Sequence, residues 1–178
     1  MPTLDNLQTA FNGESNARTK YLAFAKKADE EGYAQVASLF RAAAAAEEIH
    51  ANNHASVIRK MGANPKADIA PPVPKSTREN LATAIQGETY ERDVMYPAFI
   101  KEAETENNRQ AVIMFGGALA AETEHARLYQ QALDNLDQWR AGKRDFWICL
   151  VCGFTVAAAP ADRCPVCKAP KEKFKIVN

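Results

Sequence analysis

The feature that most constrains the fold of this sequence is a short motif that occurs twice. Glu47 and His50 are three residues apart, and so are Glu122 and His125. Side chains three residues apart lie on one face of an α-helix, about 5–6 Å apart at Cβ, so a carboxylate and an imidazole with this spacing can reach one metal ion. Helical bundles that bind two metal ions combine two such pairs with single glutamates from two other helices. Either pair alone also occurs on solvated helix faces, so the repetition is what predicts a dimetal bundle.

Apolar residues recur at helical intervals in long segments of the chain, at residues 3–31, 34–61, 77–106 and 109–141. Between the second and third of these, residues 62–75 contain four prolines and cannot be helical. A segment of this length suits a crossover that runs the length of a bundle, and it could also allow a helix pair to swap between subunits. The sequence therefore predicts a mainly α protein built on a four-helix bundle.

Two sequence features have local consequences for the third predicted helix. Ser76 and Glu79 form the capping-box pattern that opens a helix. Pro97 removes a backbone N–H within the same segment, so we expect a local kink near it.

Further acidic residues lie on helix faces where water-exposed acids are not expected. Glu14 interrupts the apolar stripe of the first helix, and Glu88 and Glu91 are three residues apart on the third. Tyr21 and Tyr96 lie two turns along the same faces and could support a site there. Together with the repeated pairs, these acids meet the requirement of a dimetal bundle with one to spare, Glu91. Carboxylates with two imidazoles suit iron or manganese better than a structural zinc ion.

The remaining histidine, His54, follows His50 by one helical turn and has no carboxylate three residues before it. We expect it beside the site or at the surface rather than on a metal.

From Lys143 onward the helical periodicity stops and all four cysteines appear, in two Cys-x-x-Cys pairs within residues 149–167. This change predicts two domains, 1–142 and 143–178. A disulfide interpretation is unattractive in a reducing compartment, whereas four thiolates in paired knuckles form a tetrahedral site for zinc or iron. The spacing alone slightly favours a structural zinc ribbon. The ligands are Cys149, Cys152, Cys164 and Cys167.

Composition excludes several classes of protein. Of the 178 residues, 22 are basic and 22 acidic, so no overall field attracts nucleic acid or anionic lipid. No apolar run approaches the ~18–20 residues that span a bilayer, and the N-terminus lacks the features of a secretory signal. We therefore expect a cytoplasmic protein that binds neither nucleic acid nor membrane.

Longer motifs resemble a known family. The tail resembles a rubredoxin domain, with Trp147 before Cys-x-x-Cys-Gly-Phe, and then Cys-Pro-Val-Cys-Lys-Ala-Pro-Lys-Glu-Lys-Phe. Residues 3–141 resemble the ferritin-like domain of rubrerythrin, in the stretches Glu14-Ser-Asn-Ala-Arg-Thr-Lys-Tyr21, Glu47-Glu-Ile-His50, Gly87-Glu-Thr-Tyr-Glu91, Met95-Tyr96-Pro97 and Glu122-Thr-Glu-His125. The two modules in this order cover nearly the whole chain.

The resemblance implies roles for the site residues. Glu14 serves the first iron, Glu88 and His125 serve the second, and Glu47 and Glu122 bridge the two. Glu91 and His50 exchange as ligands of one iron when the oxidation state changes, which explains the spare acid. Tyr21 and Tyr96 hold carboxylates in place, and the four cysteines bind a single iron.

The same resemblance implies a non-haem diiron peroxidase that defends against oxidative stress. Hydrogen peroxide is reduced to water with electrons from the tetrathiolate iron, which an external NAD(P)H-dependent reductase or a rubredoxin recharges. Zinc or manganese can substitute for iron, and a homodimer or larger homo-oligomer is expected. The alternatives are a ferroxidase for iron storage, and a scaffold protein with a structural zinc ribbon.

Overall fold

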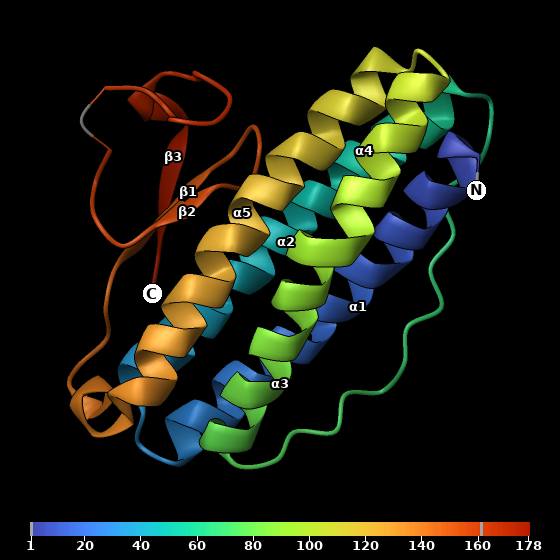
Figure 1. Ribbon diagram of the computed structural model, residues 1–178. Coiled ribbons are helices and arrows are strands. Elements are labelled where there is room, and N and C mark those ends of the chain that lie inside the picture. Colours follow the sequence, from blue (N-terminus) through green and yellow to red (C-terminus); the bar gives the residue numbers. More distant parts are fainter. Residues whose placement is uncertain (1, 161) are drawn as a thin grey trace.

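The computed structural model describes residues 2–160 and 162–178. Helices α1 (Thr3–Glu30) and α2 (Ala34–Lys60) form an antiparallel pair, joined by a turn at Gly32, whose φ of 78° favours glycine (Figure 1). Four of the five consecutive alanines of α2, Ala42, Ala43, Ala44 and Ala46, are at most 2% exposed. Their small side chains let neighbouring helices approach closely.

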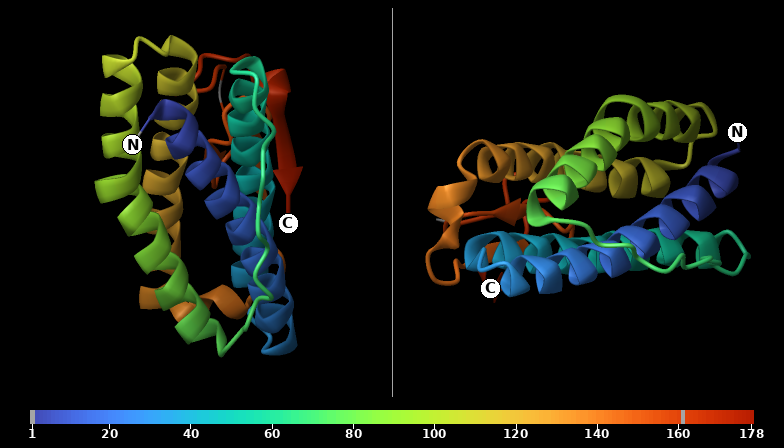
Figure 2. Two further views of the ribbon diagram at one scale, coloured as in Figure 1. Left: turned by 90° about the vertical axis from the view of Figure 1, so that its right-hand side faces the viewer. Right: turned by 90° about the horizontal axis from the view of Figure 1, so that it is seen from below.

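The connection after α2 is an extended segment that runs the length of the bundle beside α1 (Figure 2). Three side-chain amides of α1 bind its backbone, and we call this set of contacts the amide ladder. The Oε1 of Gln8 accepts from the N–H of Lys66 at 3.1 Å, the Oδ1 of Asn12 from that of Asp68 at 2.8 Å, and the Oδ1 of Asn16 from that of Ala70 at 2.9 Å. The crossover is therefore fastened to the bundle along its length.

The third predicted helix is interrupted. It consists of α3 (Thr77–Tyr90), a π-helical turn (Glu91–Met95) and α4 (Tyr96–Thr105). The capping box of Ser76 and Glu79 is confirmed. The kink expected from Pro97 stays a prediction; the π turn precedes this proline, which lies in the first turn of α4. A π turn often marks a functional site, and this one contains Glu91.

Helix α5 (Arg109–Asp134) completes the bundle and is shorter than predicted. Residues Leu136–Arg140 form a 3₁₀ turn instead of its last turns. Trp139, only 4% exposed, is buried against the core here, so tertiary packing overrides the helical periodicity of the sequence.

The C-terminal module contains a small antiparallel sheet with strand order β2-β1-β3. Strand β1 (Phe146–Cys149) pairs with β2 (Thr155–Val156) and β3 (Phe174–Val177). The module lies against α2 and α5 (Figure 1), where Asn53 donates to the carbonyl of Val151 at 2.9 Å. Within the described residues, no helix is both long and apolar enough to cross a bilayer.

Candidate metal centres

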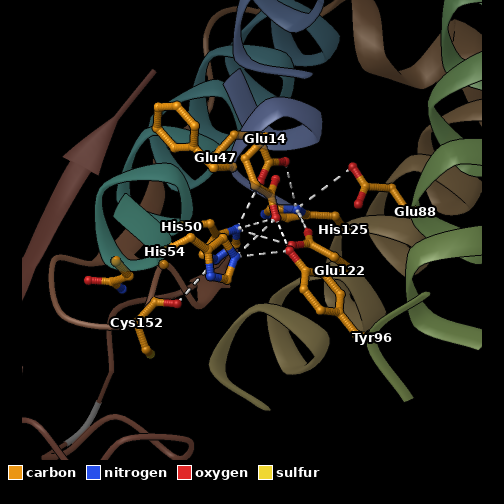
Figure 3. Close-up of polar contacts among 12 residues, drawn as sticks. Glu14, Glu47, His50, His54, Glu88, Tyr96, Glu122, His125 and Cys152 are labelled. Carbon is orange, nitrogen blue, oxygen red and sulfur yellow. Dashed lines mark hydrogen bonds and ion pairs between the residues drawn. The ribbon is translucent and has the colours of Figure 1, made fainter. Parts of the chain in front are cut away.

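Donor atoms from the bundle helices converge in the interior in two groups that share two members (Figure 3). Glu47 and Glu122 belong to both groups. One group is completed by Glu14 and His50, and the other by Glu88 and His125. Within each group, one ligand atom per residue lies within 4.8 Å of the others. The sharing of two glutamates is what a pair of bridged metal ions requires.

The repeated Glu-x-x-His motif builds the centre of this cluster. The Nδ1 of His50 lies 2.9 Å from Glu47 Oε2, and the Nδ1 of His125 lies 2.8 Å from Glu122 Oε2. The motifs also interlock, because His50 Nδ1 lies 3.0 Å from Glu122 Oε1 across the bundle. Both imidazoles thus present Nδ1 to the cluster and leave Nε2 pointing away from it.

Two tyrosines bind the glutamates at the ends of the cluster, each across to another helix. Tyr21 of α1 donates to Glu88 Oε1 at 2.5 Å, and Tyr96 of α4 donates to Glu14 Oε1. The sequence placed each tyrosine near the glutamate of its own helix. The structure pairs them crosswise, because the helices are antiparallel.

The buried acids need compensation that the described residues do not supply. All six donor residues are at most 1% exposed. Burial, followed by the charges of Glu47 and Glu122, holds the pKa of Glu14 well above its usual range. The Oε2 atoms of Glu14 and Glu88 have no hydrogen-bond partner within the described part of the chain. Unpaired buried oxygens in each donor group fit a pair of divalent ions, which would offset the cost of burying these charges.

The buried carboxylates also change the pKa of the histidines. Burial alone would lower the pKa of His125, but hydrogen bonds and charges from Glu122 and Glu47 outweigh it and raise the pKa to about 9. A metal ion would replace the proton on Nδ1, since a ligating imidazole must be neutral there.

Glu91 lies outside both donor groups. It is partly exposed and lines a cleft of about 560 Å³ between α1, α3 and the crossover, together with Lys20, Gly87 and Val73. Burial, followed by the charges of Glu122 and Glu47, raises its pKa to about 8. The spare acid predicted from the sequence therefore lines this cleft, as does Tyr21, which donates to Glu88 of the cluster.

His54 is not at the surface but fully buried, with Nε2 3.2 Å from the Tyr96 hydroxyl. Burial, followed by the charge of His50, lowers its pKa to about 3, so this imidazole is neutral. Of the two placements that the sequence left open, the structure selects the one beside the site.

The C-terminal module contacts the outer nitrogens of both ligand histidines. The Nε2 of His50 lies 3.1 Å from the carbonyl oxygen of Cys152, and the Nε2 of His125 lies 3.0 Å from Thr155 Oγ1. Acceptors at Nε2 fix the ring orientation and leave Nδ1 free for metal, a common arrangement around ligating histidines. Sequence reasoning missed Thr155, because nothing in its local pattern distinguishes it.

Glycines allow this close approach. A Cβ atom on Gly153, whose φ is 79°, would lie 2.2 Å from His50 Nε2. A Cβ on Gly117 would lie 3.4 Å from the Cβ of Cys152, so close packing against the C-terminal module favours a glycine at this position inside α5.

The second metal centre is formed by the four cysteines, which are unpaired and lie within 4.8 Å of one another. The sulfur atoms of Cys149 and Cys167, and those of Cys152 and Cys164, are 3.6 Å apart. Metal–sulfur bonds of about 2.3 Å in a tetrahedron place the sulfurs roughly 3.8 Å apart, so the cluster has the size of a tetrathiolate site. Cys167 alone is partly exposed.

The sequence model of the family described as Rubrerythrin matches residues 5–133. The chain belongs to the rubrerythrin family. A second model, described as the rubredoxin-like domain of rubrerythrin, matches residues 147–175. The chain is 41% identical to nigerythrin of Nitratidesulfovibrio vulgaris over 97% of its own length and 85% of that protein. It is 36% identical to rubrerythrin-2 of Clostridium acetobutylicum, over 97% of this chain and 95% of that one.

Solved structures agree with this membership. The fully reduced, all-ferrous state of nigerythrin superimposes with a TM-score of 0.90 at 39% identity, covering 99% of this chain and 87% of that one. Bacterioferritin BfrA of Mycobacterium tuberculosis matches with a TM-score of 0.70 at 20% identity, over 78% of this chain and 90% of that one. The second likeness shows the bundle fold alone.

These findings confirm the predicted family, the ferritin-like bundle with a rubredoxin-like tail, and the dinuclear and tetrathiolate iron cofactors of this rubrerythrin-family protein. The role of each ligand, the domain boundary at 142/143 and the cytoplasmic location stay predictions.

Proposed function

We propose that this rubrerythrin-family protein reduces hydrogen peroxide to two molecules of water with electrons that enter through its C-terminal module. The observation that carries this proposal is the contact between the two metal centres. The backbone of one knuckle cysteine, Cys152, meets a ligand histidine of the bundle, His50, at 3.1 Å. A ferroxidase that stores iron removes electrons from it and needs no such return path.

The two cofactors divide the chemistry. When bound, a diferrous pair held by the bundle donors would supply the two electrons that, with two protons from solvent, convert hydrogen peroxide to two waters, and an iron held by the four cysteines would return these electrons one at a time. The residues around the pair supply position: Tyr21 and Tyr96 hold the outer carboxylates, and His50 and His125 are held by the C-terminal module. Peroxide reaches the cluster through the cleft lined by Glu91. An NAD(P)H-dependent reductase or a rubredoxin recharges the tail.

We further infer that Glu91 and His50 hold the same ion in turn. In this structure His50 belongs to a donor group, whereas Glu91 lies outside it in the cleft. The negative carboxylate favours the ferric ion, and the neutral imidazole is relatively better for the ferrous ion.

The function is tested on anaerobically purified, iron-grown protein. We expect iron in both centres, and peroxide consumption coupled to NADH oxidation when a rubredoxin and its reductase are added. Zinc in the tail together with no peroxide turnover would favour the scaffold alternative. Rapid oxidation of added ferrous iron by O₂, with a growing ferric mineral, would favour iron storage.

The ligand exchange is tested with two substitutions. Glu91→Ala should keep two irons when reduced but lose stability in the diferric state, whereas His50→Ala should weaken the diferrous state. Structures of the wild-type protein in both oxidation states give the direct comparison. Identical ligands in both, with Glu91 away from the metal each time, would show that no exchange occurs.

A further inference from the structure

His54 is a buried polar side chain that the proposed reaction does not use. It lies on α2 one turn beyond His50 and is 0% exposed. Its ring packs against the rings of Tyr96 and Phe115, with centroid distances of 6.1 and 5.4 Å. Its Nε2 lies 3.2 Å from the Tyr96 hydroxyl, which itself binds Glu14 (Figure 3). An imidazole is a costly way to fill this space unless its polar atoms have a task.

The number of available hydrogens determines which group is the donor and which is the acceptor in each of these hydrogen bonds. A phenol has one hydrogen to donate, and a carboxylate that ligates a metal can only accept. Tyr96 therefore donates to Glu14, and the phenol oxygen can only accept from His54. This requires the hydrogen of the neutral imidazole to be on Nε2. Nδ1 then carries the lone pair, which agrees with its having no hydrogen-bond partner in the described part of the chain.

We propose that His54 is a positioning residue for the dimetal centre, which acts through Tyr96 to fix the carboxylate of Glu14. His54, Tyr96 and Glu14 form a chain in which every bond points toward the metal site. Bonds aligned in this way polarise one another, so the His54 N–H makes the phenol a stronger donor and also holds its rotation. The inference rests on the proposed dimetal centre and is independent of the peroxide reaction.

The other end of the cluster provides an internal control. Tyr21 donates to Glu88 as Tyr96 does to Glu14. Behind Tyr21, however, lie the rings of Phe24, Phe40 and Tyr129, with centroids 5.6–6.2 Å away, and no imidazole. The two outer carboxylates are thus held differently, and only the Glu14 end depends on His54.

The bond direction is tested by ¹⁵N NMR of the imidazoles in protein whose bundle is loaded with zinc. We expect His54 to show the neutral form protonated on Nε2, unchanged across neutral pH. A neutral form protonated on Nδ1 would overturn the proposal, because that ring could not donate to Tyr96.

The positioning role is tested by a double-mutant cycle that measures ferrous-iron affinity by competition with a chelator. His54→Leu should weaken binding of one of the two ions roughly tenfold, in the range found for residues that orient ligands. His54→Gln, whose side-chain amide can donate, should recover part of the loss. Adding His54→Leu to Tyr96→Phe should cause no further loss.

The matched control is the same substitution in a Tyr21→Phe background. There His54→Leu should keep its full tenfold effect, since Tyr21 lies at the other end of the cluster. Equal additional losses in the Tyr96→Phe and Tyr21→Phe backgrounds would show that His54 only fills space, and the proposal would fail. Because iron affinity is measured without peroxide, this failure is distinguishable from failure of the proposed reaction.

Discussion

The ligands of one metal centre lie close together in the sequence, whereas those of the other are far apart. The tetrathiolate ligands lie within residues 149–167, on two knuckles of a small module. The dimetal donors extend from Glu14 to His125 and come from every helix of the bundle except α4. The first centre needs only local turns, whereas the second exists only when the whole bundle has folded. A change in one centre should therefore leave the fold of the other intact.

The centres also differ in their contact with solvent. Cys167 is partly exposed, whereas the dimetal donors are at most 1% exposed. A partly exposed thiolate suits exchange of electrons with a partner, and a buried carboxylate cluster suits chemistry protected from water. The buried cluster therefore depends more strongly on its metals for stability.

The largest effect is expected from Cys164→Ser. Oxidised wild-type protein should be red from thiolate-to-iron charge transfer, and the variant should be colourless because its iron loses one of four thiolates. The helical circular dichroism of the bundle should be unchanged, and turnover with the natural donor chain should disappear. Loss of helicity in the variant would show that the centres are not independent.

Removal of the bundle metals should produce a large, pH-dependent loss of stability. The pKa of Glu91 is raised to about 8 and that of His125 to about 9, and the pKa values of Glu14 and Glu88 are raised as well. Groups with raised pKa stabilise the fold below their ordinary pKa and lose that contribution as the pH rises through the folded value. The metal-free protein should therefore melt lower at pH 8.5 than at pH 5.5, by about 10 °C for a few kcal/mol.

Circular dichroism melts of chelated and reloaded protein provide the measurement. The reloaded protein should not show this fall, because metal binding becomes stronger as protons leave its ligands. Glu122, whose pKa is lowered mainly by His50 against the effect of burial, acts in the opposite direction only at acid pH. A metal-free protein that becomes more stable toward pH 8.5 would contradict the assignment of these acids.

A smaller effect is expected at the contact between the centres. Gly153→Ala introduces a Cβ 2.2 Å from His50 Nε2 at a positive φ, so the two modules must separate slightly. Iron should remain in both centres, while electron transfer from the tail to the bundle slows about tenfold in stopped-flow measurements. Gly116→Ala is the control, since a Cβ there meets nothing within 4 Å. Equal rates in the two variants would mean that the contact does not carry the electron.

The smallest effect is expected from Asn16→Ala. Its amide makes two bonds to the crossover, from Nδ2 to the Asp68 carbonyl at 2.8 Å and from the Ala70 N–H to Oδ1 at 2.9 Å. Exposed hydrogen bonds of this kind contribute about 1 kcal/mol. The bundle should melt about 3 °C lower, with the colour of the tail unaffected. An equal shift in the melting of the tail would contradict the separation of the two modules.

The features that could be predicted from the sequence are those that depend on local spacing, as the cysteine centre does. The cysteine knuckles and the Glu-x-x-His pairs were visible because their spacing is local. The helix bounds were predicted to within one residue for α1 and α2, where Gly32 and Gly62 follow the last helical residues. The π turn at Glu91–Met95 was not foreseen, since only a kink follows from Pro97.

Features that depend on distant segments could not be read from the sequence. The crosswise pairing of Tyr21 with Glu88, the bond of Thr155 to His125 and the burial of His54 each join parts of the chain that meet only in the fold. No spacing rule reaches across the 67 positions between Tyr21 and Glu88.

The amide ladder has a consequence that follows from two repeat lengths. Gln8, Asn12 and Asn16 advance by four helical residues, about 6.0 Å at 1.5 Å each. The backbone N–H groups that they bind, at Lys66, Asp68 and Ala70, advance by two extended residues, about 6.2–6.6 Å. The two periods nearly match, so a helix and an extended chain stay in phase along three steps. An insertion of one residue inside the ladder would turn the following N–H groups away from the helix, whereas an insertion of two could be looped out between steps. For this crossover, whether an insertion adds an odd or an even number of residues therefore matters more than how many residues it adds.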